Sequence, residues 1–264
     1  MRRAERPTTP TGVGVVGVVA VAFVTVPLIG LASRTPWGQI PQLVRDPAVL
    51  AATRLSLVAS LSALALSTVL GVPLAWLLAR GDFPGRRLVR ALAVLPMVLP
   101  PVVGGVALLL AFGRRGLFGQ ALFDATGWSL PFATVGVILA ETFVAMPFLV
   151  VTVESGLRSM DRRYEEAAAT LGASRWTILR TVTLPLIAPS LAGGMALCWA
   201  RALGEFGATI SFAGNLPGRT QTMPLAVYLE LESNPPAAYL LSFVLLVISV
   251  AVLVGMRDRY LGRS

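Results

Sequence analysis

Long apolar segments recur along the whole chain, and they constrain its fold more than any motif does. Each holds about 20 residues with few charges, enough for a helix to cross a bilayer core of about 30 Å. With 55% hydrophobic and 13% charged residues and a mean hydropathy of +0.76, the 264-residue chain is too apolar for a soluble domain. We therefore expect an all-α integral membrane protein.

Six of these segments are long enough to span a membrane, and they predict one transmembrane domain over residues 13–256 with short tails at 1–12 and 257–264. The expected spans are Val13–Leu31, Arg54–Ala79, Leu88–Phe112, Phe132–Val153, Leu186–Ile210 and Ala237–Met256. The first segment could instead be a signal peptide, because it follows a basic N-terminus. Its apolar run exceeds the roughly 7–15 residues of a signal core, so we expect an uncleaved span.

The arginines lie mostly at one set of span ends, which orients the predicted bundle. Fifteen arginines fall at the two termini, near 80–90 and in the loop at 156–184, against six at the opposite ends. Positive residues gather on the cytoplasmic side of membrane proteins. We therefore expect a multi-pass protein of the cell (inner) membrane with both termini in the cytoplasm. The net charge of +9 follows from this topology, and the sequence resembles no nucleic-acid-binding module.

The residue types that are missing narrow the chemistry. The chain has no histidine, and all 22 of its basic residues are arginine. It therefore lacks imidazole metal ligands and the lysine of a P-loop, so this chain cannot itself be a Walker-type ATPase. The single cysteine, Cys198, lies in an apolar run and is expected to be a small packing residue. We expect no catalytic residue, metal or cofactor on this chain.

The loop between the fourth and fifth spans predicts two short helices. Asp161 is a suitable N-cap for a first helix over Arg162–Thr170, which Gly172 ends. Ser174 can cap a second helix that runs through Arg180. A polar helical excursion of this kind between membrane spans is either a solvated linker or a docking element.

The side chains of this hairpin favour docking onto another protein. Glu166 lies on the polar side of the first helix, while Ala167 and Ala168 present a small surface that another protein can approach closely. Arg175 and Trp176 offer a charged and an aromatic anchor of the kind found in docking contacts. The alternative is a solvated amphipathic hairpin that lies on the membrane surface.

The tripeptide Glu166-Ala167-Ala168 is followed by Gly172 and by Val182-Thr183-Leu184-Pro185. This spacing resembles the coupling motif of prokaryotic ABC importer permeases, Glu-Ala-Ala, Gly and Ile-x-Leu-Pro, with Val182 as a conservative departure. Pro185 is expected to mark the return of the chain into the bilayer. The resemblance implies a type I ABC importer permease fold, with coupling helices at about 161–181 that seat in a groove of a separate ATPase. The residues implied in ATPase coupling are Glu165, Glu166, Ala167, Ala168, Gly172, Arg175, Trp176 and Pro185.

A second resemblance limits the class of substrate that we expect. The run Ala200–Ile210 contains Gly-Glu-Phe-Gly, and Asn215–Pro224 reads Asn-Leu-Pro-Gly-Arg-Thr-Gln-Thr-Met-Pro. Together with Pro100–Gly105 and Ala111–Gly116, these runs are similar to permeases of the molybdate/tungstate/sulfate family, and most similar to its molybdate branch. The Gly-Glu-Phe-Gly core is shared with sulfate permeases. The resemblance therefore implies oxyanion import, with molybdate as the expected substrate and sulfate or tungstate as alternatives.

The expected partners follow from the same resemblance. One copy with six spans encloses too little for a gated pathway, so we expect a two-fold homodimer. Two ABC ATPase subunits would carry ATP and Mg²⁺, and an extracytoplasmic molybdate-binding protein would deliver the substrate. The external segments at about 33–53, 113–131 and 211–236 would receive that binding protein.

Three ionisable residues lie at membrane depth, where each costs about 3 kcal/mol on insertion scales. Arg201 and Glu205 are one helical turn apart in the fifth span, and Glu141 lies at a similar depth in the fourth. We predict that Arg201 pairs with Glu141, Glu205 or both as a buried clamp between helices. Direct contact with the substrate is the alternative.

Pro100, Pro101, Gly104 and Gly105 interrupt the third span near its middle. Backbone groups freed at a kink must be satisfied inside the protein or by a cavity, so this kink is a candidate lining of the translocation path. A kinked packing helix without a pore role is the alternative.

Two other classes of protein fit part of the pattern. An intramembrane enzyme would need a nucleophile with a base, or a metal cluster, and is disfavoured by the absence of histidine and of a cysteine pair. A secondary transporter fits the hydropathy, and Glu141 could then relay protons. Such a transporter would not need the coupling loop.

Overall fold

The computed structural model describes residues 11–43 and 45–260, and these residues form helices and short connections without a strand. The helices are α1 (Thr11–Arg34), α2 (Ile40–Leu43), α3 (Pro47–Arg80), α4 (Arg86–Val98), α5 (Pro101–Phe112), α6 (Gly119–Thr126), α7 (Thr134–Ser159), α8 (Arg163–Thr170), α9 (Arg175–Ile178), α10 (Leu184–Leu203), α11 (Gly207–Phe212), α12 (Met223–Ser233) and α13 (Pro235–Tyr260). A 3₁₀ turn at Trp37–Gln39 precedes α2, and a π-helical segment at Leu179–Thr183 joins α9 to α10.

The predicted all-α membrane architecture is confirmed, with a difference in the number of unbroken spans. Four helical runs are long and apolar enough to cross a bilayer: Gly12–Arg34, α3, α7 and the 29-residue run Arg175–Leu203. The predicted third span consists of two helices, α4 and α5, and α13 contributes a shorter apolar stretch, Pro235–Ala251. Within the described part of the chain, the expected six spans are therefore four long helices, one broken pair and one shorter apolar helix.

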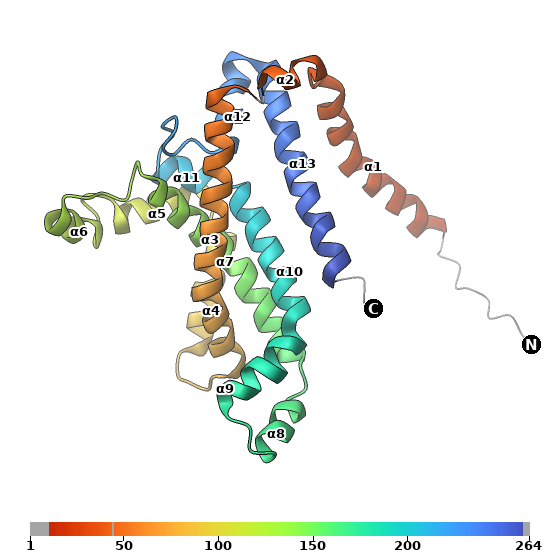
Figure 1. Ribbon diagram of the computed structural model, residues 1–264, viewed down its shortest axis with the longest axis vertical. Coiled ribbons are helices and arrows are strands. Elements are labelled where there is room, and N and C mark those ends of the chain that lie inside the picture. Colours follow the sequence, from red (N-terminus) through yellow and green to blue (C-terminus); the bar gives the residue numbers. More distant parts are fainter. Residues whose placement is uncertain (1–10, 44, 261–264) are drawn as a thin grey trace, which may run out of the picture.

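The core lies where α3, α7 and α10 pack against one another (Figure 1). Helices in lipid associate by close packing rather than by a hydrophobic driving force, so small residues gather at their contacts. On α3 the buried positions are mostly Ala, Ser and Gly. A Cβ added at Gly71 would lie 3.2 Å from both Met146 and Val150 of α7. Small side chains thus let the two longest core helices approach closely.

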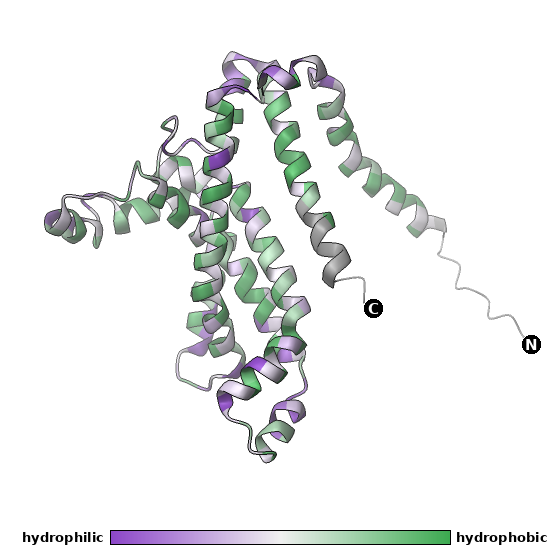
Figure 2. Ribbon diagram, in the orientation of Figure 1, coloured by the Kyte–Doolittle hydropathy of each residue, from purple (hydrophilic) through white to green (hydrophobic). Residues whose placement is uncertain are grey.

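The polar residues gather at the ends of the helices, as a membrane protein requires. Figure 2 shows apolar residues along the lengths of α3, α10 and α13, with hydrophilic residues at the two ends of the molecule. The hairpin of α8 and α9 hangs from one end, next to the end of α3 and the start of α4, while α2 and α12 lie toward the other (Figure 1). The coupling loop therefore lies at one pole of the bundle.

The first helix stands apart from the core. Its described residues are exposed almost throughout, and the helix that it packs against is α13 (Figure 1). The chain after α1 is anchored to α13 by Trp37, whose ring lies 4.8 Å from that of Phe243 in an edge-on arrangement. The apolar surface of α1, including Phe23 at 80% exposure, is left for lipid or another protein to cover.

The third predicted span, Leu88–Phe112, is not one continuous helix. The chain leaves α4 at Val98 and begins α5 at Pro101, and the two helices are bent by 119°. The physical reason is the Pro-Pro pair: the residue before a proline is driven out of the α region, and Leu99 and Pro100 have extended ψ angles of 135° and 132°. The bend is a break between helices rather than a mild kink.

The fifth predicted span, Leu186–Ile210, ends early. The helix α10 stops at Leu203, Gly204 occupies its C-cap, and a short helix α11 follows. The N-terminal tail falls almost wholly outside the described residues, which begin at Thr11, and the C-terminal residues 261–264 also lie outside them.

Candidate coupling loop and intramembrane ion cluster

The first helix of the loop begins at Arg163, one residue later than the predicted start at Arg162. Residue Arg162 takes the N-cap position of α8, and the Asp161 carboxylate accepts a hydrogen bond from the Arg163 amide at 3.0 Å. The Asp161 side chain therefore does satisfy a free amide at the start of α8, as a capping residue should.

The turn between the two short helices depends on Gly172. Its φ of +83° lies in the left-handed region, which side chains with a Cβ adopt only at a cost. The Gly172 amide donates to the Ala169 carbonyl at 3.0 Å, and the Ala173 amide donates to the Ala168 carbonyl at 3.1 Å. The helix α9 then starts with the Thr177 amide bonded to the Ser174 hydroxyl at 3.2 Å. Both predicted turn signals are present.

The second short helix, predicted to end at Arg180, is not separate from the fifth span, predicted to begin at Leu186. The chain runs from α9 through the π-helical segment into α10 as one continuous run from Arg175 to Leu203. A proline inside a helix removes one amide donor and crowds the preceding turn. The Leu184 amide bonds to the Leu179 carbonyl, five residues earlier, so the wider π turn accommodates the ring. The second short helix is therefore one end of a membrane helix, not a separate element.

The two adjacent glutamates of α8 differ in their contacts and exposure. Glu165 faces the membrane helices: one carboxylate oxygen lies 3.3 Å from Arg80 Nη2 at the end of α3. Its other oxygen accepts a hydrogen bond from the Thr183 hydroxyl at 2.7 Å. Glu166 is exposed and makes no such contact among the described residues. A cavity of about 350 Å³ lies between these groups, lined also by Arg175.

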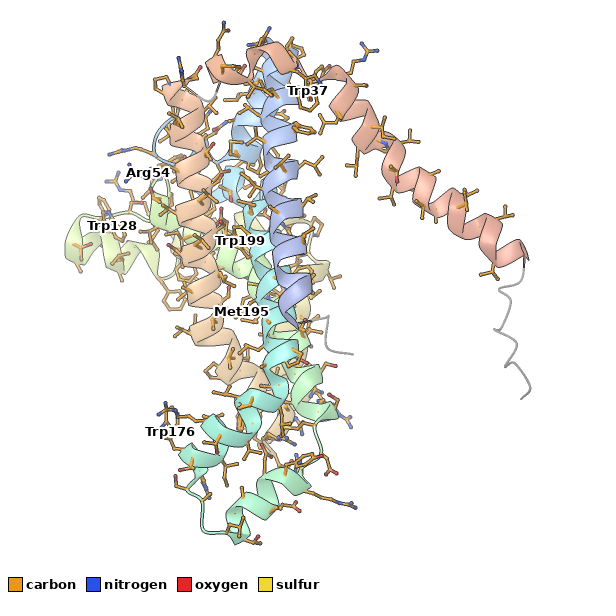
Figure 3. All side chains as sticks on the ribbon, turned by 45° about the vertical axis from the view of Figure 1, so that its right-hand side comes forward. Trp37, Arg54, Trp128, Trp176, Met195 and Trp199 are labelled. Atoms are coloured by element: carbon orange, nitrogen blue, oxygen red, sulfur yellow. The ribbon has the colours of Figure 1, made fainter. Side chains whose placement is uncertain are left out.

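The outer surface of the loop carries the exposed apolar side chains. Trp176 projects from α9 (Figure 3) with 64% of its surface exposed, and Leu171 at the turn is 89% exposed. Tyr164 on α8 is 59% exposed, while Ala167 is exposed and Ala168 half-buried. Leu171 and Tyr164 are additions to the predicted docking residues. The sequence signal for Leu171 was an apolar residue at a polar turn, just before Gly172.

A cluster of three arginines covers the end of α3. The Leu78 carbonyl accepts hydrogen bonds from Arg86 Nε at 2.9 Å, Arg90 Nη2 at 3.2 Å and Arg158 Nη2 at 3.5 Å. The carboxylate of Glu154 on α7, which is 7% exposed, lies 2.6 Å from Arg90 Nη2 and 2.9 Å from Arg158 Nε. The arginines that the sequence assigned to topology therefore also join α3, α4 and α7 beside the loop.

The intramembrane ion cluster has one of the predicted pairs. Arg201, in the last turn of α10, forms an ion pair with Glu205. The other Glu205 oxygen accepts a hydrogen bond from the Ala208 amide at 2.8 Å, so this carboxylate holds both sides of the break between α10 and α11. Glu141 of α7 is 1% exposed, and its Oε2 has no hydrogen-bond partner. Among the described residues, the ion pairs of Arg201 do not include Glu141.

The glycines of the broken third span allow a close contact with α11. A Cβ added at Gly105 would lie 2.6 Å from Ser211 Cβ and 2.8 Å from the Ala208 carbonyl oxygen. At Gly104 it would lie 3.2 Å from the Phe143 ring. The break at Pro100 and Pro101 thus turns α5 across the bundle and against α11, close in sequence to the Arg201–Glu205 pair.

A family profile described as "Binding-protein-dependent transport system inner membrane component" matches residues 71–263. The match includes the loop of α8 and α9 as well as the ion cluster. The chain belongs to this family. Membership assigns the permease to the membrane component of such a system, not to an ATPase, an intramembrane enzyme or a secondary transporter.

Curated relatives cover nearly the whole permease. It is 44% identical over 250 residues to the molybdenum transport system permease protein ModB of Mycobacterium tuberculosis, covering 95% of this chain and 94% of the relative. It is 42% identical over 206 residues to ModB of Escherichia coli, covering 76% and 90%. The sulfate transport system permease protein CysT of Escherichia coli is 37% identical over 227 residues, covering 85% and 81%.

Solved structures share the fold of the permease. A bacterial ABC transporter involved in the import of the acidic polysaccharide alginate superposes with a TM-score of 0.74 at 17% identity, covering 96% of both chains. The alginate transporter in complex with a periplasmic protein bound to an alginate pentasaccharide gives 0.73 at 17% identity, covering 94% of this chain and 92% of the other. The permease therefore has the ABC importer permease fold.

Proposed function

We propose that this permease is the membrane subunit of an ATP-driven ABC importer that carries molybdate from an extracytoplasmic binding protein to the cytoplasm. The observation that carries the proposal is the 44% identity to a molybdenum transport permease along 95% of the chain. The family membership over residues 71–263 and the exposed hairpin with the coupling motif support the same function. Sulfate is the second candidate, favoured by the 37% identity to a sulfate permease.

The coupling loop is the proposed docking site for the ATPase subunit. Its outer face presents Glu166, Arg175 and Trp176, together with the exposed Leu171. Aromatic and arginine side chains at the centre of such a surface are the usual anchors of an interface. Two ATPase subunits, which supply ATP and Mg²⁺, would each seat one loop of a permease dimer. Closure of the ATPase pair would then move the two loops and switch the pathway.

A second copy of the chain is the proposed partner within the membrane. The apolar sides of α1 and α5 are uncovered in one copy: Val19, Phe23, Val102 and Leu110 are each at least half exposed. Lipid can cover part of this surface, but a pathway for a dianion needs walls on all sides. Two copies related by a two-fold axis provide them.

The proposed orientation places both termini and the coupling loop in the cytoplasm. The bias of fifteen arginines against six supports it. The arrangement in Figure 1 agrees, because α1 begins and α13 ends on the side of the molecule away from α2, toward the coupling loop. The segments around α2, α6 and the start of α12 would then face the binding protein. Arg201 and Glu205 are proposed as a clamp at membrane depth rather than as a substrate site.

Uptake by cells that lack their own molybdate and sulfate importers tests this function. Cells that express the permease with its ATPase and binding protein should accumulate labelled molybdate, and excess unlabelled molybdate should compete more strongly than sulfate. Stronger competition by sulfate would assign the permease to sulfate import. Uptake that persists without the ATPase subunit would contradict the ABC mechanism altogether.

A further inference from the structure

The helix α9 of the coupling hairpin continues directly into α10, whereas α8 is held against the membrane helices by side-chain contacts, and one residue makes two of these. Glu165 of α8 lies beside Arg80 of α3 and Thr183 of the α9–α10 run at once, through its two carboxylate oxygens. The Arg80 and Glu165 side chains are 13% and 20% exposed, and Thr183 is fully buried. Three elements that are distant in sequence therefore meet at one carboxylate.

The neighbouring glutamate cannot serve this purpose. Glu166 follows Glu165 on α8 but is exposed, and successive helical positions point about 100° apart. The two carboxylates therefore differ in what they contact: Glu165 bonds to this chain's own helices, whereas Glu166 is exposed and, among the described residues, has no ion pair. An eight-residue helix with few buried side chains has little else to hold it in place.

Arg80 lies at the end of α3, which the arginine cluster ties to α4 and α7. The Leu78 carbonyl, two residues before Arg80, accepts hydrogen bonds from Arg86, Arg90 and Arg158. A displacement of α8 that pulls on Arg80 therefore acts on the start of α4 as well. The other end of α4 is the Pro-Pro break at Leu99, beyond which α5 packs on α11.

We infer that Glu165 is a positioning residue that makes α8 move as one body with α3 and with the continuous α9–α10 run, whereas Glu166 belongs to the surface that meets the ATPase. The inference rests on the proposed function and goes beyond it, because it separates transmission of the movement from docking. A permease without the Glu165 contacts binds its ATPase and lets it hydrolyse ATP, but α8 moves without carrying α3.

The test compares ATPase binding, ATP hydrolysis and molybdate uptake for the full importer in proteoliposomes with the loaded binding protein. Glu165→Gln keeps the shape of the side chain and removes its charge. Asp82→Asn is the matched control, since Asp82 is an exposed carboxylate in the loop after α3 without an ion pair among the described residues. For Glu165→Gln we expect unchanged ATPase binding and at least about a fivefold loss of molybdate imported per ATP, the lower end of allosteric coupling.

Two further variants distinguish a loss of coupling from a loss of folding. The exchange of charges in Arg80→Glu/Glu165→Arg should restore much of the transport per ATP that either single variant loses, with ATPase binding unchanged throughout. Thr183→Val removes the second contact of Glu165 with little change in side-chain volume. It should also lower the amount of molybdate imported per ATP. If Glu165 served only to stabilise the fold, exchanging the two charges would not be expected to restore molybdate transport per ATP.

The outcomes separate this inference from the proposed function. If Glu165→Gln transports as much per ATP as the wild type, or if it loses ATPase binding as Glu166→Arg does, the inference is overturned. An exchanged pair that stays uncoupled overturns it as well. If the wild-type permease itself neither binds an ATPase nor imports molybdate, the proposed function fails first.

Discussion

Arg90 of α4 and Glu154 of α7 are 64 positions apart in the sequence, yet Arg90 Nε and Nη2 donate hydrogen bonds to the same Glu154 oxygen at 2.9 and 2.6 Å. Arg158 reaches that oxygen from one turn further along α7, at 2.9 Å. The carboxylate is nearly buried, whereas its partners are a third to a half exposed. A single acidic side chain thus pairs with two arginines where three helices meet beside the coupling hairpin.

Removing that charge should destabilise the permease. We expect Glu154→Gln to lower the free energy of unfolding by about 1–2 kcal/mol, below the 3–5 kcal/mol of a fully buried pair because water screens the arginines. Thermal unfolding of the purified permease in detergent measures the effect, with Asp82→Asn as control. An unfolding temperature equal to that of the control would contradict the role given to Glu154.

The backbone at Gly172 should matter more for ATPase binding than for folding. A Cβ at Gly172 meets nothing within 4 Å, so Gly172→Ala acts through its φ of +83° alone, which costs a residue with a Cβ about 1–2 kcal/mol. Gly85→Ala carries the same strain, with φ of +82° and no neighbour, in the loop before α4. Affinity for the ATPase should fall for Gly172→Ala and hold for Gly85→Ala. Equal losses in both would mean that the turn is not specific to docking.

The contact of α5 with α11 should tolerate no side chain at Gly105. Because an added Cβ would meet the Ala208 carbonyl oxygen at 2.8 Å, one of the two helices must shift, and overpacking of this kind costs about 1–3 kcal/mol. Gly193→Ala in α10 is the matched control, since nothing lies within 4 Å of its added Cβ. The free energy of unfolding should fall for Gly105→Ala only, and a loss of equal size at Gly193 would rule out the close contact as its cause.

The Arg201–Glu205 pair should act as a unit. Arg201→Leu leaves the Glu205 carboxylate, which is 1% exposed, without its counter-charge, and we expect a loss of about 3 kcal/mol or more in stability. Glu205→Gln in the same chain removes the unpaired charge and keeps an acceptor for the Ala208 amide, so the double variant should regain part of the loss. Intact assembly and transport in Arg201→Leu alone would refute the clamp.

Much of the fold followed from the sequence because bilayer thickness fixes the length of apolar helices. The segment predicted at Arg54–Ala79 lies within α3, and the turn chemistry of Gly172 and Ser174 set the hairpin as expected. These features depend on local composition and on single residues with special backbone needs. Neither requires knowledge of which helices touch.

The differences arose where distant segments decide the outcome. The Pro100-Pro101 pair predicted a kink in the third span. The size of the bend, 119°, and the packing of Gly105 on α11 are seen only in the structure. The second short helix was expected to end at Arg180, with Pro185 marking the return into the bilayer, yet a π-helical turn joins the two helices into one run. The opposite roles of Glu165 and Glu166 could not be separated by pattern, because the partner that distinguishes them, Arg80, lies on another helix.

The central claim is that an ATPase drives the membrane helices through the coupling hairpin. The most direct measurement is molybdate uptake into proteoliposomes that contain the permease and its ATPase, with the loaded binding protein outside and ATP inside. The account predicts uptake that depends on ATP and is abolished by Glu166→Arg, together with loss of the ATPase from the purified complex. Uptake that continues with Glu166→Arg, or without any ATPase, would contradict it.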